Sequence, residues 1–525
     1  MVIISKNGDY LGVFVYFGYI TICVSLPVTN IASGKLELQT DGSKWSREGV
    51  DEVYRMVNKQ TNTKVAKNII LFIGDGMGVT TMTAARILDG QLKGQSGEDN
   101  KLYFETYDHT SLAKTYCLDK MTPDSASTAT AMLTGVKTNY KILGMDGNAV
   151  VNNCSHSMKY SQKLQTILHW AQKLGKRTGI VSTARVTHAT PAAAYSHTAN
   201  RDWEGDVNME QQDAPCKDIA RQLIEDNPTI NVILGGGRRH FLPNTMRDPG
   251  TGRIEDSQRA DGRDLIKEWL SDKRSRNSTY SYVWNRDQFL NVSGNKEYLL
   301  GLFSSSHMSY DIDRRTSGKQ GEPSLSEMTN KAIDILSKGQ NGYFLLVEGA
   351  RIDHGHHDNK AKKALYDVLA FDNAVKAAGS RPESSPDTTL SIVTADHSHV
   401  FNIVGYPQRG SDVLGLVRDT GGLVTDQNGK PYTILHYSNG PSYTQNINLR
   451  YVNTTTAWFP FPAGYSTQYE THGGEDVVVY AKGPMSHLVR GSHEQTYITY
   501  VMAYSACIGP FLDPSNSPVC SSGRV

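Results

Sequence analysis

The sequence predicts an α/β protein with a large, mostly parallel central sheet flanked by helices. Continuous apolar runs that contain β-branched residues recur along the chain, and such runs are typical of parallel strands buried on both faces. Segments with the apolar spacing of helices separate the runs, as in proteins whose strands and helices alternate. The runs occupy residues 68–76, 178–183, 231–234, 342–347 and 389–395.

Helical patterns stand before and between these runs. Residues 45–59 carry apolar side chains at helical spacing with charged residues between them, which predicts a surface helix. Residues 164–174 and 364–377 are also helical in pattern. Residues 405–470 are rich in Gly, Tyr, Asn, Ser and Pro, so we expect an inserted, mostly β or irregular subdomain there. The α/β domain would then comprise residues 45–404 and 471–510, with a tail over 511–525.

The N-terminal segment has the pattern of a secretory signal. Lys6 precedes an apolar run from Leu11 to about Leu26, and small residues follow at 31–34. We predict a signal peptide over residues 1–33, with an uncleaved N-terminal anchor as the alternative. Both place the remaining chain outside the cytosol, secreted or at the cell surface. The segment after Cys520 shows no hydrophobic tail of the kind that a lipid anchor needs, which leaves membrane attachment open.

Cysteines and sequons agree with an extracellular location. Five cysteines follow the apolar run, so two disulfides and one free thiol are favoured. The close pair Cys507 and Cys520 is expected to join, and Cys154 with Cys216 is the favoured second bridge. Cys117 would then be free, in a strand-like run. The possible glycan sites are Asn153, Asn277, Asn291 and Asn453. The net charge of +1 gives no reason to expect nucleic acid as a partner.

Chemically active side chains stand at the ends of the predicted strands. Ligands of open α/β sheets bind beyond the carboxyl ends of the strands, and this is where Asp75, Glu348, Asp396 and His397 fall. Ser125 follows Pro123 at the start of a predicted helix, where backbone N–H groups favour an anion. The alternative is that Ser125 only caps this helix.

Two further clusters have the residue types of metal ligands. Asp353 and His357 are four residues apart, so on a helical turn they share a face and can hold one ion. With Asp396, His397 and His472 they form mixed sets that suit Zn²⁺. An oxygen-only set that suits Mg²⁺ could come from Asp75, Thr190 and Glu348.

The chain resembles the animal alkaline phosphatases over nearly all of its length after the N-terminal segment. Six separated motifs appear in the order of the family. They are residues 72–78 (FIGDGMG), 123–126 (PDSA), 187–191 (THATP), 348–357 (EGARIDHGHH), 394–399 (TADHSH) and 471–476 (THGGED). The resemblance implies an alkaline phosphatase-like fold in which residues 405–470 are the variable crown. It also implies a homodimer and small phosphate monoesters as substrates.

The resemblance also implies a role for each matching residue. Ser125 would be the nucleophile that becomes a phosphoserine, and Arg201 would bind the phosphate. His188 and His354 would be outer histidines of the site. One zinc would be held by Asp353, His357 and His472, and a second by Asp75, Asp396, His397 and Ser125. One magnesium would be held by Asp75, Thr190 and Glu348.

Some features depart from the family or leave alternatives. Animal members often bind an additional calcium ion, but Ser304 stands where a Glu is common and Glu322 where an Asp is common. No convincing acidic counterpart is found near Asp248-Pro249-Gly250, so these departures argue against calcium. A related phosphodiesterase or sulfatase on the same scaffold, and a binding protein without activity, are the alternative functions. The complete set of expected residues favours a phosphate monoester hydrolase of broad specificity.

Overall fold

The computed structural model describes residues 2–7, 10–17, 20–27, 42–210, 215–316, 318, 321–444, 447–513, 515 and 520. The chain forms two compact units, residues 1–60 and residues 61–525. The first contains three antiparallel strands, β1 (Val2–Asn7), β2 (Tyr10–Phe17) and β3 (Ile20–Pro27), and the helix α1 (Gly42–Val57). No residue of α1 is buried, which confirms the predicted surface helix.

The prediction of a signal peptide or anchor over residues 1–33 stays a prediction, because it extends outside the described residues. Among the helices that the structure describes, none has both the length and the apolar character needed to cross a membrane.

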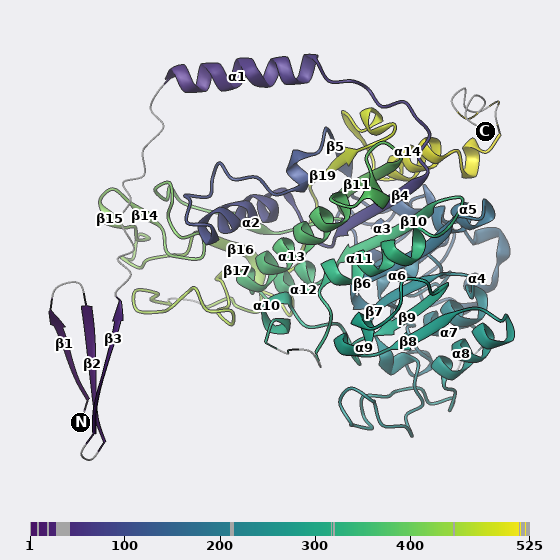
Figure 1. Ribbon diagram of the computed structural model, residues 1–525, viewed down its shortest axis with the longest axis horizontal. Helices are drawn as coiled ribbons and strands as arrows, with labels where there is room; N and C mark the ends of the chain where they lie inside the picture. The colour runs from purple at the N-terminus through teal and green to yellow at the C-terminus, as the bar shows by residue number, and fades with distance from the viewer. Residues whose placement is uncertain are drawn as a thin grey trace. The chain divides into compact units, whose positions relative to one another are not determined.

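The second unit is built on a ten-stranded sheet (Figure 1). Its strand order is β20-β5-β19-β11-β4-β10-β6-β7-β9-β8. All strands run in one direction except β19, which is antiparallel to both of its neighbours. The bounds are β4 (Asn68–Gly74), β5 (His109–Lys114), β6 (Arg177–Arg185), β7 (Val232–Gly236), β8 (Tyr280–Val283), β9 (Tyr298–Leu302), β10 (Tyr343–Gly349), β11 (Thr389–Ala395), β19 (Val477–Lys482) and β20 (Ser492–Glu494).

The five predicted strands are the centre of this sheet, and they confirm the mostly parallel α/β fold. Every residue of β4 and β10 is buried, because helices cover both faces, and this burial explains the continuous apolar runs. The remaining five strands were not predicted. β19 is also an apolar run, but its buried and half-buried residues alternate, as expected for a strand with one face covered.

Two groups of helices pack on the sheet. One group contains α2 (Val79–Leu92), α11 (Leu325–Leu336), α12 (Arg351–His357) and α13 (Ala361–Gly379), and the other contains α3 (Ser125–Thr134), α5 (Ile167–Lys173), α6 (Ala189–Ala193) and α14 (Tyr497–Ala506). The predicted helices at 164–174 and 364–377 are α5 and α13. The other α-helices of this unit are α4 (Cys154–Met158), α7 (Ile219–Arg221), α8 (Leu265–Ser275), α9 (Arg286–Leu290) and α10 (Asp311–Arg314).

Residues 405–470 contain short strands and irregular segments. The strands in and next to this insert are β12 (Ser398–His399), β13 (Phe401–Ile403), β14 (Arg418–Asp419), β15 (Gly422–Leu423), β16 (Leu435–Gly440), β17 (Ala463–Ser466) and β18 (His472–Gly473). β12 pairs with β18, so the chain entering the insert is joined to the chain leaving it. The domain boundaries themselves stay predictions.

Both predicted disulfides are present. Cys154 joins Cys216 and Cys507 joins Cys520, with Cα atoms 5.8 and 5.5 Å apart. Cys117 is free and buried, as predicted. It lies in the loop after β5 rather than in a strand, because the ladder with β19 ends before it.

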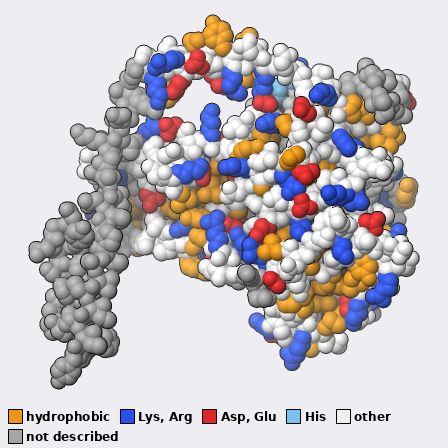
Figure 2. Space-filling view, viewed as in Figure 1, with side chains coloured by type: hydrophobic (Ala, Val, Ile, Leu, Met, Phe, Trp, Pro, Cys, Tyr) orange, Lys and Arg blue, Asp and Glu red, His pale blue; other side chains and the backbone are white. Residues whose placement is uncertain are grey.

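The surface of the second unit bears mixed charge. Figure 2 shows Lys and Arg side chains interspersed with Asp and Glu on the visible face, in keeping with the net charge of +1. Of the predicted glycan sites, Asn277, Asn291 and Asn453 are exposed and Asn153 is half-buried. Their occupancy stays a prediction.

Candidate active site

Ser125 is the first residue of α3, where the sequence places it. Asp124 is the N-cap, and its carboxylate accepts a hydrogen bond from the backbone N–H of Ser127 at 3.2 Å. Because Asp124 does the capping, the Ser125 hydroxyl is directed elsewhere. It lies 3.3 Å from Asp75 Oδ1 and 3.1 Å from His397 Nε2. The simple capping alternative is therefore not what the structure shows.

The first group of possible metal ligands lies at the carboxyl ends of β4 and β11. His397 Nε2 is 3.2 Å from Asp396 Oδ2 and 3.5 Å from Asp75 Oδ1, and all three residues are fully buried. Backbone N–H of Gly76 and the Thr128 hydroxyl hold the Asp396 carboxylate by donating to its two oxygens. Parallel strands thus bring Gly76 and Asp396, 320 positions apart in the sequence, to one point, as predicted.

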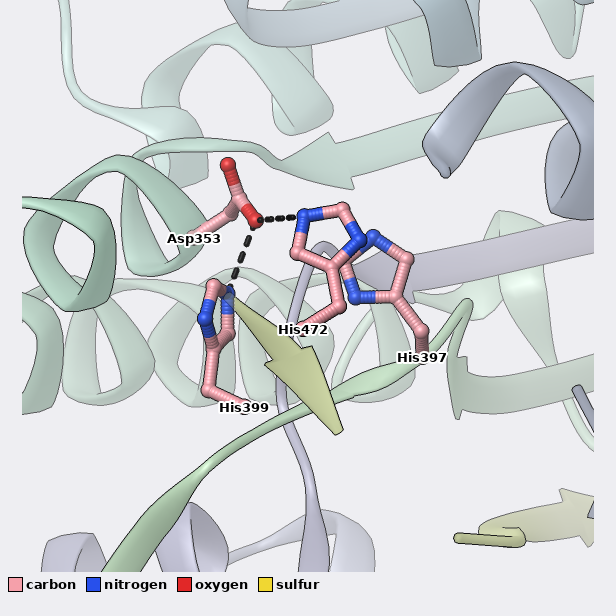
Figure 3. Close-up of side chains that lie close together, drawn as sticks. All are labelled: Asp353, His397, His399 and His472. Atoms are coloured by element: carbon pink, nitrogen blue, oxygen red, sulfur yellow. Dashed lines mark hydrogen bonds and ion pairs between the residues drawn. The ribbon is translucent and has the colours of Figure 1, made fainter. Parts of the chain in front are cut away.

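The second group comes from α12 and from the end of the insert. Asp353 Oδ2 is 3.3 Å from His357 Nε2, which confirms that the two share one helical face. His472 Nε2 is 3.3 Å from Asp353 Oδ1 and 3.2 Å from His357 Nε2. Figure 3 shows Asp353 and His472 pointing toward one another, with His397 beside His472. The structure therefore brings together the three residues of the predicted first zinc set.

The third group is the oxygen-rich one. Glu348, at the end of β10, has a ligand atom close to Asp75 and to His188. Thr190, in α6, lies near enough for its hydroxyl to lower the pKa of Glu348. Glu348 also accepts a hydrogen bond from Ser182. The predicted magnesium set is thus assembled.

The electrostatics of these groups fit bound cations. Burial, and then the neighbouring carboxylates, raise the pKa of Asp75 well above its usual range. Burial likewise raises the pKa of Glu348 to about 7. Asp75 Oδ2 and Glu348 Oε1 are buried and have no hydrogen-bond partner. Carboxyl groups buried in this way either take up protons or are neutralised by a bound cation. Mixed His and carboxylate donors are of the kind that suits zinc, and oxygen donors are of the kind that suits magnesium.

Arg201 lies beside Ser125's helix. Its Nη1 donates to Asp124 Oδ2 at 3.1 Å, and its Nη2 donates to His188 Nε2 at the same distance. Burial disfavours the charge of Arg201, but Asp124 outweighs this and raises the pKa of the guanidinium. The guanidinium of Arg201 is therefore held in its charged form next to Ser125.

His188 and His354 meet a third histidine, His307, that the sequence did not single out. The ring centroids of His188 and His354 are 5.4 Å apart, and His307 lies 4.2 Å from His354. Burial lowers the pKa of all three rings well below 6.5. Each ring faces an arginine donor: Arg201, Arg185 and Arg351 donate to His188, His307 and His354 respectively. Arginine only donates, so these nitrogen lone pairs are already engaged.

A second pair missed from the sequence is His399 and Glu470. His399 Nε2 donates to Asp353 Oδ1 at 2.8 Å, and Nδ1 donates to Glu470. Burial opposes a charged imidazole here, but Glu470 and Asp353 raise the pKa of His399 to about 10. The sequence signal for a close contact at this place is Gly76, the middle glycine of the FIGDGMG motif. A Cβ on Gly76 would lie 2.4 Å from His399 Nε2, so only glycine fits.

The more accessible of these side chains line a cleft of about 620 Å³, whereas Asp75, Asp396, His397 and Glu348 lie buried outside its lining. Its lining includes Ser125, Arg201 and the exposed edges of the second ligand group, His357 and His472. A serine at a helix start, between buried cation sites at the carboxyl edge of a parallel sheet, defines a metal-dependent hydrolase.

The chain belongs to the alkaline phosphatase family. The family model for alkaline phosphatase matches residues 66–508. The chain is 44% identical to the tissue-nonspecific isozyme of alkaline phosphatase from Gallus gallus, over 93% of this chain and 92% of that protein. It is 43% identical to the human tissue-nonspecific isozyme, over 93% of both. It is 42% identical to the membrane-bound alkaline phosphatase of Bombyx mori, over 91% of this chain and 88% of that one.

Solved structures agree in fold. The alkaline phosphatase of Thermus thermophilus superposes with a TM-score of 0.60 at 24% identity, covering 86% of this chain and 93% of that one. The enzyme of the Antarctic bacterium TAB5 gives 0.57 at 21% identity, covering 85% and 99%. The protein is a metal-dependent phosphate monoester hydrolase, as the resemblance implied.

Proposed function

We propose that Ser125 is the nucleophile of this phosphate monoester hydrolase and that the reaction passes through a phosphoserine. The observation that carries the proposal is the position of Ser125 Oγ. It lies at the start of α3, within 3.3 Å of Asp75 and 3.1 Å of His397, and so next to the group formed by Asp75, Asp396 and His397. A serine hydroxyl is a weak nucleophile unless its environment stabilises the alkoxide.

The proposed reaction has two chemical steps. Ser125 Oγ attacks phosphorus, the bond to the leaving alcohol breaks, and the phosphoryl group is held as an ester of Ser125. A water then attacks the phosphoserine and returns free Ser125 and inorganic phosphate. Arg201 binds two non-bridging oxygens through its planar fork in both steps. The backbone N–H groups at the start of α3 add to this anion site.

We assign two zinc ions and one magnesium ion to the three ligand groups. Asp353, His357 and His472 would hold one zinc, Asp75, Asp396 and His397 the other, and Asp75, Thr190 and Glu348 the magnesium. When bound, the metals supply Lewis acidity for the attacking and leaving oxygens. His188 and His354 would orient Arg201 and the magnesium group from outside. The residues around Ser304 give no support for calcium.

The assay that tests this function is hydrolysis of p-nitrophenyl phosphate at alkaline pH. It is run before chelation, after chelation, and after Zn²⁺ and Mg²⁺ are restored, beside a diester and a sulfate ester. We expect monoester turnover that chelation removes and the two metals restore, with two zinc ions and one magnesium ion per chain by metal analysis. Turnover of the diester in place of the monoester would contradict the proposal.

The extracellular features also belong to the proposal. A homodimer, a location outside the cytosol and glycans on the four sequons are supported by the family, the two disulfides and the predicted signal. Sedimentation of the secreted protein, with and without glycosidase treatment, tests them together. A reduced monomer retained inside the cell would contradict this part.

A further inference from the structure

Tyr469 is an exposed aromatic residue in the lining of the cleft. Its side chain is 60% exposed, although it stands next to Glu470, which is only 1% exposed. Its ring lies edge-on to that of His357, with centroids 6.5 Å apart. An aromatic residue left uncovered beside a reaction centre has an apolar face available to a ligand.

The backbone beneath Tyr469 is held in place. Glu470 N donates to His357 O at 3.1 Å, and His357 Nδ1 donates back to Glu470 O at 2.6 Å. The Glu470 carboxylate accepts from His399 and from Val400 N. The Thr467 hydroxyl donates to Tyr469 O at 2.6 Å. Tyr469 is therefore presented by a rigid segment, which lowers the entropy lost when a ligand contacts it.

Tyr140 is the other tyrosine of the cleft lining. It is half-buried, and its N–H donates to Asp119 Oδ1 at 2.8 Å. The next residue, Lys141, donates its N–H to Asp124, the cap of the Ser125 helix. Tyr140 therefore belongs to the Ser125 side of the cleft, whereas Tyr469 belongs to the His357 side.

Polar groups dominate the rest of this lining. The arginines and Lys141 are each paired with a carboxylate, as in Arg201 with Asp124 and Lys141 with Asp202. Apart from five histidine rings, Tyr140 and Tyr469 carry the aromatic side chains of this lining, so a leaving group that extends from a phosphate at Ser125 can contact their rings. The cleft volume of about 620 Å³ is ample for a nucleotide.

We propose that Tyr469, assisted by Tyr140, is a stacking surface for planar leaving groups, so that nucleoside and aryl phosphates are preferred over aliphatic phosphates of the same leaving chemistry. The inference rests on the proposed function, because the phosphate must sit at Ser125 for the leaving group to reach these rings. Tyr469 is a specificity-determining residue here and takes no part in the bond-making steps.

The test compares kcat/KM for adenosine 5′-phosphate and ribose 5-phosphate. These substrates expel the same kind of 5′-alkoxide and differ in the planar base. We expect Tyr469→Leu to lower the ratio of the two values by about 3- to 10-fold, in line with the energies of aromatic contacts. Tyr469→Phe should keep the ratio within about twofold of wild type, since the ring is retained.

Tyr451→Leu is the matched control, because Tyr451 is 93% exposed and lies outside the cleft lining. It should leave the ratio unchanged. An unchanged ratio in Tyr469→Leu, with turnover of both substrates intact, would overturn this inference and leave the proposed function standing. A wild-type chain that hydrolyses neither substrate would overturn the proposed function, and the inference with it.

Discussion

The two sides of the metal site differ in depth and in how their charges are balanced. Asp75, Asp396 and Glu348 are completely buried, and burial raises the pKa of each. On the other side, His357 and His472 keep 28% and 12% of their side chains exposed. Burial would also raise the pKa of Asp353, but the surrounding histidines hold it well below its usual range.

This difference shows which side depends more on bound cations. The deep side (Asp75, Asp396 and Glu348) contains carboxylates that repel one another, so in their charged form they are stabilised by bound cations, and without cations they take up protons. The shallow side (Asp353, His357 and His472) already contains groups that balance its carboxylate, because His399 and His472 both lie against Asp353. We therefore expect the deep side to bind its ions as part of folding, and the shallow side to exchange its ion with the cleft solution.

The largest expected effect breaks the chemistry while leaving the carboxylate and histidine ligands in place. Ser125→Ala should lower kcat by at least about 10³-fold, because the nucleophile is lost while the aspartate, glutamate and histidine ligands remain. Activity on p-nitrophenyl phosphate and metal content of the purified variant are the measurements. Thr134→Ser, a change at the other end of the same helix, is the control. Wild-type activity in Ser125→Ala would disprove the covalent mechanism.

The metal content of two variants tests the difference between the deep and the shallow side. Asp75 belongs to two ligand groups, whereas His357 belongs to the shallow side. We expect Asp75→Ala to lose about two metal equivalents and to melt at a clearly lower temperature, and His357→Ala to lose about one zinc with a smaller change in melting. Equal losses in both variants, by metal analysis and calorimetry, would remove the distinction between the sides.

Arg201→Lys should have an intermediate effect. The positive charge is retained, but a lysine cannot bind two phosphate oxygens through a planar fork. We expect kcat/KM to fall by about 10- to 100-fold, equivalent to about 1.4–2.8 kcal/mol, with unchanged metal content. Steady-state kinetics and competition by inorganic phosphate measure the loss. Arg351→Lys, which alters a guanidinium bonded to His354 and not to Asp124, is the comparison variant.

The last effect is on stability and not on activity, and it concerns a buried carboxyl that belongs to neither side. Burial, and then Asp311, raise the pKa of Asp367 to about 8. In the unfolded chain this group ionises near 4, so its burial costs stability progressively as pH rises from about 4 to about 8. Asp367→Asn should be more stable than wild type by about 1–3 kcal/mol at pH 9 and similar to it at pH 4. Denaturant melts at the two pH values check the sign, which would be wrong if the difference were larger at pH 4.

Whether a contact of the site could be predicted from the sequence depends on the elements that form it. Asp75, Glu348 and Asp396 could be placed because parallel strands align their carboxyl ends, and β4, β10 and β11 are readable as continuous apolar runs. Ser125 could be placed from Pro123 and the helical pattern after it. The contact of His399 with Glu470 could not be predicted, because it depends on where the chain lies when it leaves the long insert. His307 follows the short strand β9, whose pattern is too weak to fix what its loop approaches.

The pairing of β12 with β18 has a consequence for how this architecture can vary. His399 and His472 are register partners in this short ladder, so the insert departs and returns at one fixed place. The entropy of closing a loop grows only slowly with its length. Residues between the two strands, apart from those that hold the site such as Glu470, can therefore be lengthened, shortened or exchanged while the ladder keeps His399 and His472 together. Most of the insert can thus acquire a new surface without a change in the reaction centre.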